Sequence, residues 1–271
     1  FTRSILGRYF NHFSGGFLFF RGDWQNVRHS APYQGMLQVA DIGLLPIGLF
    51  SVFKLTKHRY IQFILLWLLL APLPSALSRD EVHAVRSLST AAPLVLVVSM
   101  GASTIFSYLK NHRVILIIPL ILYFMSVIYF LDELFVHLPE KDSKPWFYGY
   151  REVMKEFIGK EQNYSKIKIE QSYDQPYIYY LFYSKYDPLK YQEVNHFNQI
   201  NQYDVGTVTQ IDNIYFEELD WTSDLNVARS LTIGNPYTLN MDYADPNKVK
   251  DVKDIYYLDD APAFRIVRSN P

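Results

Sequence analysis

Cysteine is absent from the 271-residue chain, which excludes disulfide frameworks, thiolate zinc sites and a cysteine nucleophile. A basic excess is also missing, because 26 Lys and Arg stand against 27 Asp and Glu. Nucleic-acid binding needs a marked positive balance, so no nucleic-acid partner is expected. The sequence has neither a glycine-rich nucleotide loop nor a Gly-x-Ser-x-Gly nucleophile elbow, and no cofactor is predicted.

Charge is scarce in the first half of the chain. Residues 1–136 hold 11 Lys or Arg and 6 Asp or Glu, whereas residues 137–271 hold 15 and 21. The first part therefore has a net charge of +5 and the second of −6. The contrast predicts a membrane domain over 1–136 and a water-soluble domain over 137–271. The first residue is Phe and no short apolar leader follows, so the chain is expected to begin inside a longer protein.

Uncharged runs predict the membrane spans. Three of them have 19, 23 and 18 residues, close to the roughly 20 that a membrane helix needs. A fourth has 12 residues and qualifies only if it is extended past Asp41, which would then lie near the headgroups. The runs lack the polar face of a soluble surface helix. We expect four transmembrane helices, at about 39–55, 60–77, 91–109 and 114–134.

The short loops predict the orientation. The loop at 54–59 and the loop at 110–113 contain basic residues and no acid, which places both in the cytoplasm. Residues 1–38, the loop 77–90 and the tail then share the extracytoplasmic side. The sequence thus predicts a multi-pass protein of the cell membrane.

The outer loop 77–90 contains three basic or titratable residues. Ser78 and Glu81 fit a capping box, which predicts a short helix. On such a helix Arg79, His83 and Arg86 would line one face and could bind a phosphate, since guanidinium groups match phosphate oxygens. Val82, Val85 and Leu88 would then face the membrane. The alternative is simple anchoring at lipid headgroups.

The N-terminal outer stretch contains a second polar group. Arg21, Asp23, Arg28 and His29 lie within nine residues of a loop rich in Gly and Pro. They could hold an anionic or sugar ligand, or Asp23 could pair only with a neighbouring Arg. No metal site is predicted, because the His residues are scattered and lack acidic companions on a shared face.

These two loops carry a resemblance. FLFFRGDWQNVRHSAPYQGML at 17–37 and PLPSALSRDEVHAVRSLSTAAPL at 72–94 resemble the C-terminal half of GT-C membrane glycosyltransferases of the family 39 type. That group includes protein mannosyltransferases and bacterial aminoarabinose-transferase-like enzymes. Tail segments at 146–152 and 173–178 resemble the periplasmic tails of bacterial members, and the likeness covers most of residues 10–190.

The resemblance implies an enzyme that transfers a sugar from a polyprenyl-phosphate donor to a glycan, lipid or protein acceptor on the outer face of the membrane. In that family the catalytic acid lies on the first outer loop, which would precede this chain. The catalytic residue is therefore unknown here. Arg79, His83 and Arg86 would bind the donor phosphate and stabilise its charge as it leaves.

The tail reads as a small α/β domain that follows a linker at 139–144. A helix is expected over 145–159, strands at 166–171 and 211–216, a helix after Pro176, and a hairpin that turns at 259–262. Its many tyrosines, five of them within 173–183, indicate core packing or a carbohydrate-stacking surface.

Two other functional classes stay open at the sequence level. The first is a non-enzymatic polytopic protein whose outer α/β domain binds a partner. The second is a transporter, which is disfavoured because the spans have no clear midplane charges or paired broken helices.

Overall fold

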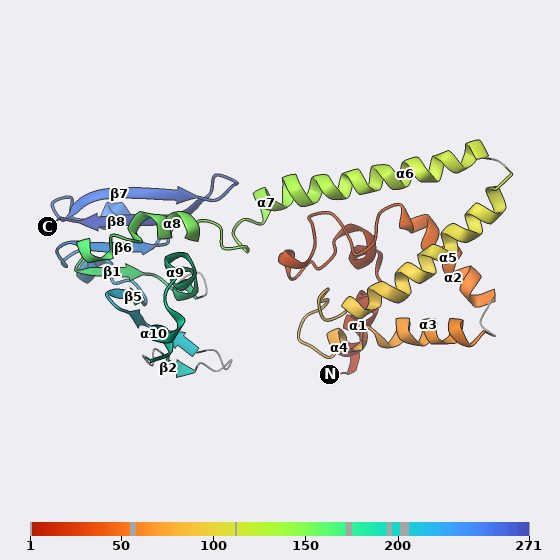
Figure 1. Cartoon of the computed structure of the whole chain (residues 1–271), viewed down its shortest axis with the longest axis horizontal. Coiled ribbons are helices and arrows are strands. Elements are labelled where there is room, and N and C mark those ends of the chain that lie inside the picture. The colour runs from red at the N-terminus through yellow and green to blue at the C-terminus, as the bar shows by residue number, and fades with distance from the viewer. Residues whose placement is uncertain are drawn as a thin grey trace. The chain divides into compact units, whose positions relative to one another are not determined.

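The computed structural model describes residues 2–54, 58–111, 113–171, 175–193, 197–200 and 206–270. The chain divides into two compact units, Phe1–Asp142 and Ser143–Pro271 (Figure 1). Each unit has its own hydrophobic core. The two units are described separately below.

Unit 1 is helical. Its α-helices are α1 (Thr2–Asn11), α2 (Asp41–Lys54), α3 (Arg59–Leu70), α4 (Leu73–Ala76), α5 (Ala91–Leu109), α6 (Arg113–Asp132) and α7 (Leu138–Lys141). Short 3-10 helices are η2 (Val27–His29) and η3 (Leu88–Thr90), and π-helical turns are η1 (Gly16–Phe20) and η4 (Glu133–His137). The segment expected as a linker thus begins in a helix, since α7 continues from α6 through η4.

Three helical segments of the described chain are long and apolar enough to cross a membrane. They span Arg59–Ala76, Leu88–Leu109 and Val114–Lys141. They coincide with the last three predicted spans. The predicted span at 39–55 corresponds to α2, which has 14 residues and begins at the buried Asp41.

Helix α2 packs closely on α5 through glycines. A Cβ added to Gly48 would lie 2.0 Å from the carbonyl oxygen of Val97, and one added to Gly101 would lie 2.1 Å from that of Leu44. The Ser51 and Thr104 hydroxyl oxygens are 2.9 Å apart across the same contact. Small residues and hydroxyl pairs are typical of helix contacts in membranes, where the hydrophobic effect does not drive helices together.

Unit 2 contains a mixed six-stranded sheet with the order β4-β5-β1-β6-β8-β7. Its strands are β4 (Gln210–Ile211), β5 (Ile214–Phe216), β1 (Lys166–Ile169), β6 (Ser230–Gly234), β8 (Pro262–Ser269) and β7 (Val249–Tyr256). Strand β1 is parallel to both neighbours, and the other pairs are antiparallel. Strands β2 (Phe197–Ile200) and β3 (Gly206–Val208) form a separate pair.

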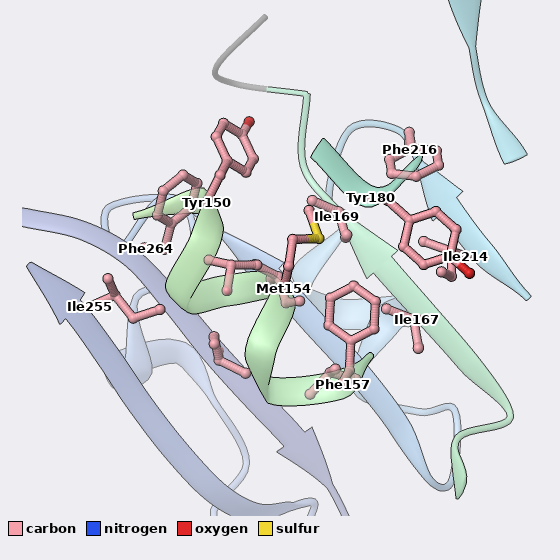
Figure 2. Close-up of a cluster of buried hydrophobic side chains, with 14 of the residues drawn as sticks. Tyr150, Met154, Phe157, Ile167, Ile169, Tyr180, Ile214, Phe216, Ile255 and Phe264 are labelled. Carbon is pink, nitrogen blue, oxygen red and sulfur yellow. The ribbon is translucent and has the colours of Figure 1, made fainter. Parts of the chain in front are cut away.

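Helix α8 (Tyr150–Phe157) packs one apolar face on this sheet. Its Tyr150, Val153, Met154 and Phe157 side chains are buried against residues of β1, β5, β6 and β8 (Figure 2). Helix α9 (Pro176–Ser184) adds Tyr180 to the same core. The described part of the unit also contains α10 (Pro188–Glu193), α11 (Trp221–Asp224) and the 3-10 helices η5 (Glu161–Asn163) and η6 (Met241–Tyr243). A smaller cluster contains Leu225, Leu239 and Val267. The tyrosine-rich helix α9 thus contributes to the core, while Tyr173 lies outside the described residues.

Several predicted elements of the tail differ from the structure. The strand expected over 211–216 is a tight hairpin of β4 and β5, because Asp212 adopts a left-handed conformation with φ of 50°. The helix expected from 145 begins at Tyr150, after Gly149 with φ of 101°. Strand β6 was not predicted, although polar and apolar residues alternate at 230–233, and all five of its residues are buried. The hairpin of β7 and β8 is confirmed.

Candidate functional site

The loop 77–90 does not form the predicted helix. After α4 ends at Ala76, residues 77–87 are irregular, and the next helical residues are those of η3. The predicted capping box between Ser78 and Glu81 is not formed either. The Ser78 hydroxyl donates to the Ser75 carbonyl, and the Glu81 amide donates to the side-chain oxygen of Gln25. The single basic face expected for Arg79, His83 and Arg86 is therefore not present.

Val82 shows why an extended loop is preferred here. It was expected to face the membrane, but it is fully buried in the core of unit 1 with Phe17 and Leu18. Folded in this way, Val82 packs against protein side chains and its apolar surface is removed from water. On the predicted helix the same side chain would have contacted lipid. Val85 and Leu88 are exposed.

The N-terminal loop is folded onto the same core. Its π-turn η1 buries Phe17, Leu18 and Phe19, and the Leu37 amide donates to the Leu18 carbonyl. Gly35 is required there, because a Cβ would lie 2.2 Å from the Phe19 nitrogen. Gly22 has φ of 56°, a left-handed conformation that glycine adopts without strain. This turn directs Asp23 inward.

Asp23 joins the two loops. Its carboxylate is fully buried, and Oδ2 accepts a hydrogen bond from the Ala84 amide at 2.8 Å. The same Oδ2 lies 2.9 Å from His29 Nδ1. Oδ1 accepts from the Asn26 amide at 3.1 Å and from its side chain at 3.3 Å. Asp23 is thus held by both loops and pairs with His29.

Two histidines stand beside this carboxylate. The rings of His29 and His83 have centroids 4.8 Å apart and are tilted by 43°. Burial lowers the pKa of His83, and the charge of Arg86 and the neighbouring His29 act in the same direction. A lowered pKa favours the neutral imidazole of His83, which was expected as a basic or titratable member of the phosphate clamp.

A third histidine, His12, contacts the backbone of the loop that contains His83. His12 is fully buried, its Nε2 lies 2.7 Å from the Ser75 hydroxyl, and the His83 amide lies 3.4 Å from the same nitrogen. Burial lowers the pKa of His12 as well. His12 thus fixes the backbone of His83, and the sequence analysis did not identify it because it lies 71 residues away in the chain.

The basic residues lie at the edge of this group. Arg86 pairs with Asp80 at 2.8 Å and is about half exposed. Arg21 stacks over Trp24 with its guanidinium carbon 5.1 Å from the ring centroid, and the Trp24 indole donates to Glu81 at 3.2 Å. Arg79 and Arg28 are exposed. The structure thus brings Asp23, His29, His83 and Arg86 together and leaves Arg79 on the surface.

Among the residues that the structure describes, two groups of side chains have the composition of a metal site. Asp23, His29 and His83 each offer a ligand atom, and these atoms lie within 4.8 Å of one another. Asp132, Glu133 and His137 form the second group. The premise that the histidines lack acidic companions is therefore wrong for His29 and His83. Sequence spacing missed the first group because its members come from two loops.

An apolar cavity of about 710 Å³ lies between α6 and the segment that leads into α2. Tyr33, Ala40, Gly43, Leu122 and Met125 are among its lining residues. Lys141 stands over the Tyr33 ring, with its nitrogen 3.8 Å from the ring centroid. An apolar hollow beside a long apolar helix is compatible with a lipid chain.

The sequence and the structure were compared with protein-family models, with curated proteins and with solved structures, and none of them matches this chain.

Proposed function

We propose that this chain is part of a membrane glycosyltransferase that moves a sugar from a polyprenyl-phosphate donor to an acceptor on the outer face of the membrane. The observation that carries the proposal is the joining of the two motif loops by Asp23. The sequence resemblance rests on those loops, and their polar groups lie together beside apolar helices. The acceptor is a glycan, a lipid or a protein.

The membrane arrangement of the proposal has four spans. The three long apolar helices cross the membrane, and α2 crosses as a short fourth span paired with α5 through Gly48 and Gly101. Both motif loops and unit 2 then lie on the extracytoplasmic side. A membrane-embedded donor would reach the loops from the side of the helices.

The roles of the side chains follow from their charge. Arg86 lies at the exposed edge of the group and offers a planar fork that matches phosphate oxygens. His29, which is held by Asp23, and neutral His83 would donate or accept hydrogen bonds at the same phosphate. Arg79, Arg21 and Arg28 are exposed and would contribute to the positive field around the donor. The catalytic acid is proposed to lie upstream of Phe1.

The test is donor transfer by the full-length protein in membranes, with labelled polyprenyl-phosphate sugars. Arg86→Ala is expected to reduce transfer about ten- to a hundred-fold, because a charge-assisted hydrogen bond contributes about 1.5–3 kcal/mol. Arg86→Lys should restore only part of the rate, since Lys has no bidentate fork.

Arg3→Ala is the matched control, because Arg3 is an exposed arginine on α1. Arg8 is not a suitable control, since its guanidinium donates to the Ser78 carbonyl at the start of the loop. Wild-type transfer by an Arg79→Ala/Arg86→Ala variant at equal expression would remove the phosphate clamp from the mechanism. Absence of transfer with every polyprenyl donor would favour the alternative, a polytopic protein whose unit 2 binds a partner.

A further inference from the structure

We propose that Asp23, His29 and His83 bind a divalent first-row transition metal, with zinc the best match. The site does not rest on the proposed glycosyl transfer. Only the role given to the metal below does.

The ligand set fits this class of ion. Two imidazoles and one carboxylate form a common zinc set, and imidazole also suits cobalt, nickel and copper. Around tetrahedral zinc the ligand atoms lie roughly 3.3–3.6 Å apart. The three ligand atoms here lie within 4.8 Å of one another. On binding, Asp23 Oδ2 and His29 Nδ1, now 2.9 Å apart, would have to separate slightly, and any distance longer than about 3.6 Å would have to shorten.

The carboxylate is held in place before any metal binds. The Ala84 amide fixes Oδ2, and the amide and side chain of Asn26 fix Oδ1. Such hydrogen bonds to a ligating carboxylate orient it and are a regular part of metal sites. They also come from both loops, so the ligand arrangement depends on the folded protein and not on local sequence.

The buried charge of Asp23 needs compensation. A carboxylate with 0% exposure is costly unless it is paired, and the ion-pair partner the structure gives it is His29. A dication bound between Asp23, His29 and His83 would compensate the charge of the buried carboxylate, and the two imidazole rings would supply the other two ligand atoms.

One side of the proposed site is open. The His29 and His83 side chains retain 22% and 12% of their exposure, whereas Asp23 is covered. Three protein ligands with an open position are the arrangement of zinc sites that bind water or substrate. If the proposed function holds, the open position would take an oxygen of the donor phosphate, next to Arg86.

The second group, Asp132, Glu133 and His137, is the alternative metal site in the described part of the chain. It comes from a single stretch of helix. Its Asp132 and His137 side chains are 50% and 40% exposed, whereas Glu133 is buried. Exposed acidic groups with a nearby histidine are common without a metal, so this group is the comparison against which the first is tested.

The experiment is a cobalt titration of the purified, chelator-treated chain in detergent, followed by zinc competition. Visible absorption of bound cobalt and the metal content after dialysis are the readouts. Wild type should bind one equivalent with a spectrum that zinc abolishes. His29→Ala and His83→Ala should each weaken binding at least ten-fold, whereas His137→Ala and His58→Ala should leave it unchanged.

Folding is checked in the same samples by the melting temperature without metal, and His83→Gln is a second variant that keeps the size of the side chain. Wild type that binds no stoichiometric metal, or binding that survives both His29→Ala and His83→Gln, would overturn the site. Loss on His137→Ala alone would place the metal at the second group and overturn it too. Metal binding by this chain, together with no sugar transfer by the full-length protein in membranes, would refute the proposed function and leave this inference standing. Sugar transfer without metal binding would refute the metal site and leave the proposed function standing.

Discussion

At the scale of single residues, the most consequential feature of unit 2 is a buried ion pair. Lys168 on β1 lies 2.9 Å from Asp224, and both side chains are more than nine-tenths buried. Asp224 also accepts from the Asp220 amide at 2.9 Å. The pair therefore fixes the start of the segment that leads into β6.

We predict that Lys168→Met destabilises unit 2 by about 3–5 kcal/mol, because it leaves Asp224 buried without its counter-charge. The double variant Lys168→Met/Asp224→Leu should recover much of that loss. Hydrogen exchange of the β1 and β6 amides in the whole chain measures both effects. Equal exchange in the single and double variants would contradict the prediction.

A second residue-scale prediction concerns acid. Arg265 binds both oxygens of Asp254 at 2.7 Å, and this contact holds the pKa of Asp254 below its ordinary value of 3.8. Because the pKa of Asp254 is lower in the folded protein, the unfolded state takes up the proton at a higher pH as the solution is acidified. The stabilisation is therefore complete above the ordinary value and is lost as the pH falls from there through the folded pKa.

We expect the protection of β7 and β8 amides in the wild type to fall as the pH drops below about 4. In Asp254→Asn this dependence should be shallower. The protection of the variant at neutral pH should be lower, because the charged pair is lost there. An unchanged pH profile in the variant would show that other carboxylates, such as Glu156 beside Lys253 and Arg268, dominate the acid response.

At the scale of elements, the contact of α2 with α5 decides how unit 1 is packed. Gly48→Ala should destabilise unit 1 by about 1–3 kcal/mol, because the added methyl would meet the Val97 carbonyl. Gly43→Ala on the same helix is the matched control, since no atom lies within 4 Å of its added Cβ. It should be neutral or stabilising, by up to about 1 kcal/mol. The midpoint of thermal unfolding in detergent gives the comparison, and equal midpoints would argue against a glycine-mediated contact.

At the scale of the whole molecule, the prediction concerns the orientation that the proposed function requires in the membrane. The chain has no native cysteine, so single cysteines can be introduced without background. We predict that Lys54→Cys and Asn111→Cys are protected from an impermeant thiol reagent in intact cells, and that Tyr237→Cys, at an 80% exposed position of unit 2, is labelled. Labelling at position 54 or 111 in intact cells would show that these loops lie outside the cell and would contradict the predicted topology. Labelling of all three after permeabilisation is the control.

The sequence by itself determined the broad plan of this protein. The uncharged runs located the three long apolar helices, and the shift in charge near residue 137 separated the helical unit from the α/β unit. The hairpin of β7 and β8 was also readable from its turn residues. These features are local, because hydropathy, charge and turn preference act within a few neighbouring residues.

The tertiary structure alone decided the candidate site and the centre of the sheet. Asp23 and Ala84 are 61 residues apart in the chain, and no periodicity connects them. The loop with His83 lost its predicted helix because burying Val82 and bonding to Asp23, Gln25 and His12 satisfied its groups better than an isolated short helix would. Strand β6 alternates polar and apolar residues at 230–233, but all five of its residues are buried, so only the folded sheet shows that its polar side chains lie inside as well. The candidate site and the place of β6 in the sheet both depend on contacts between segments that are distant in the chain. No local stretch of sequence indicates the energies of those contacts.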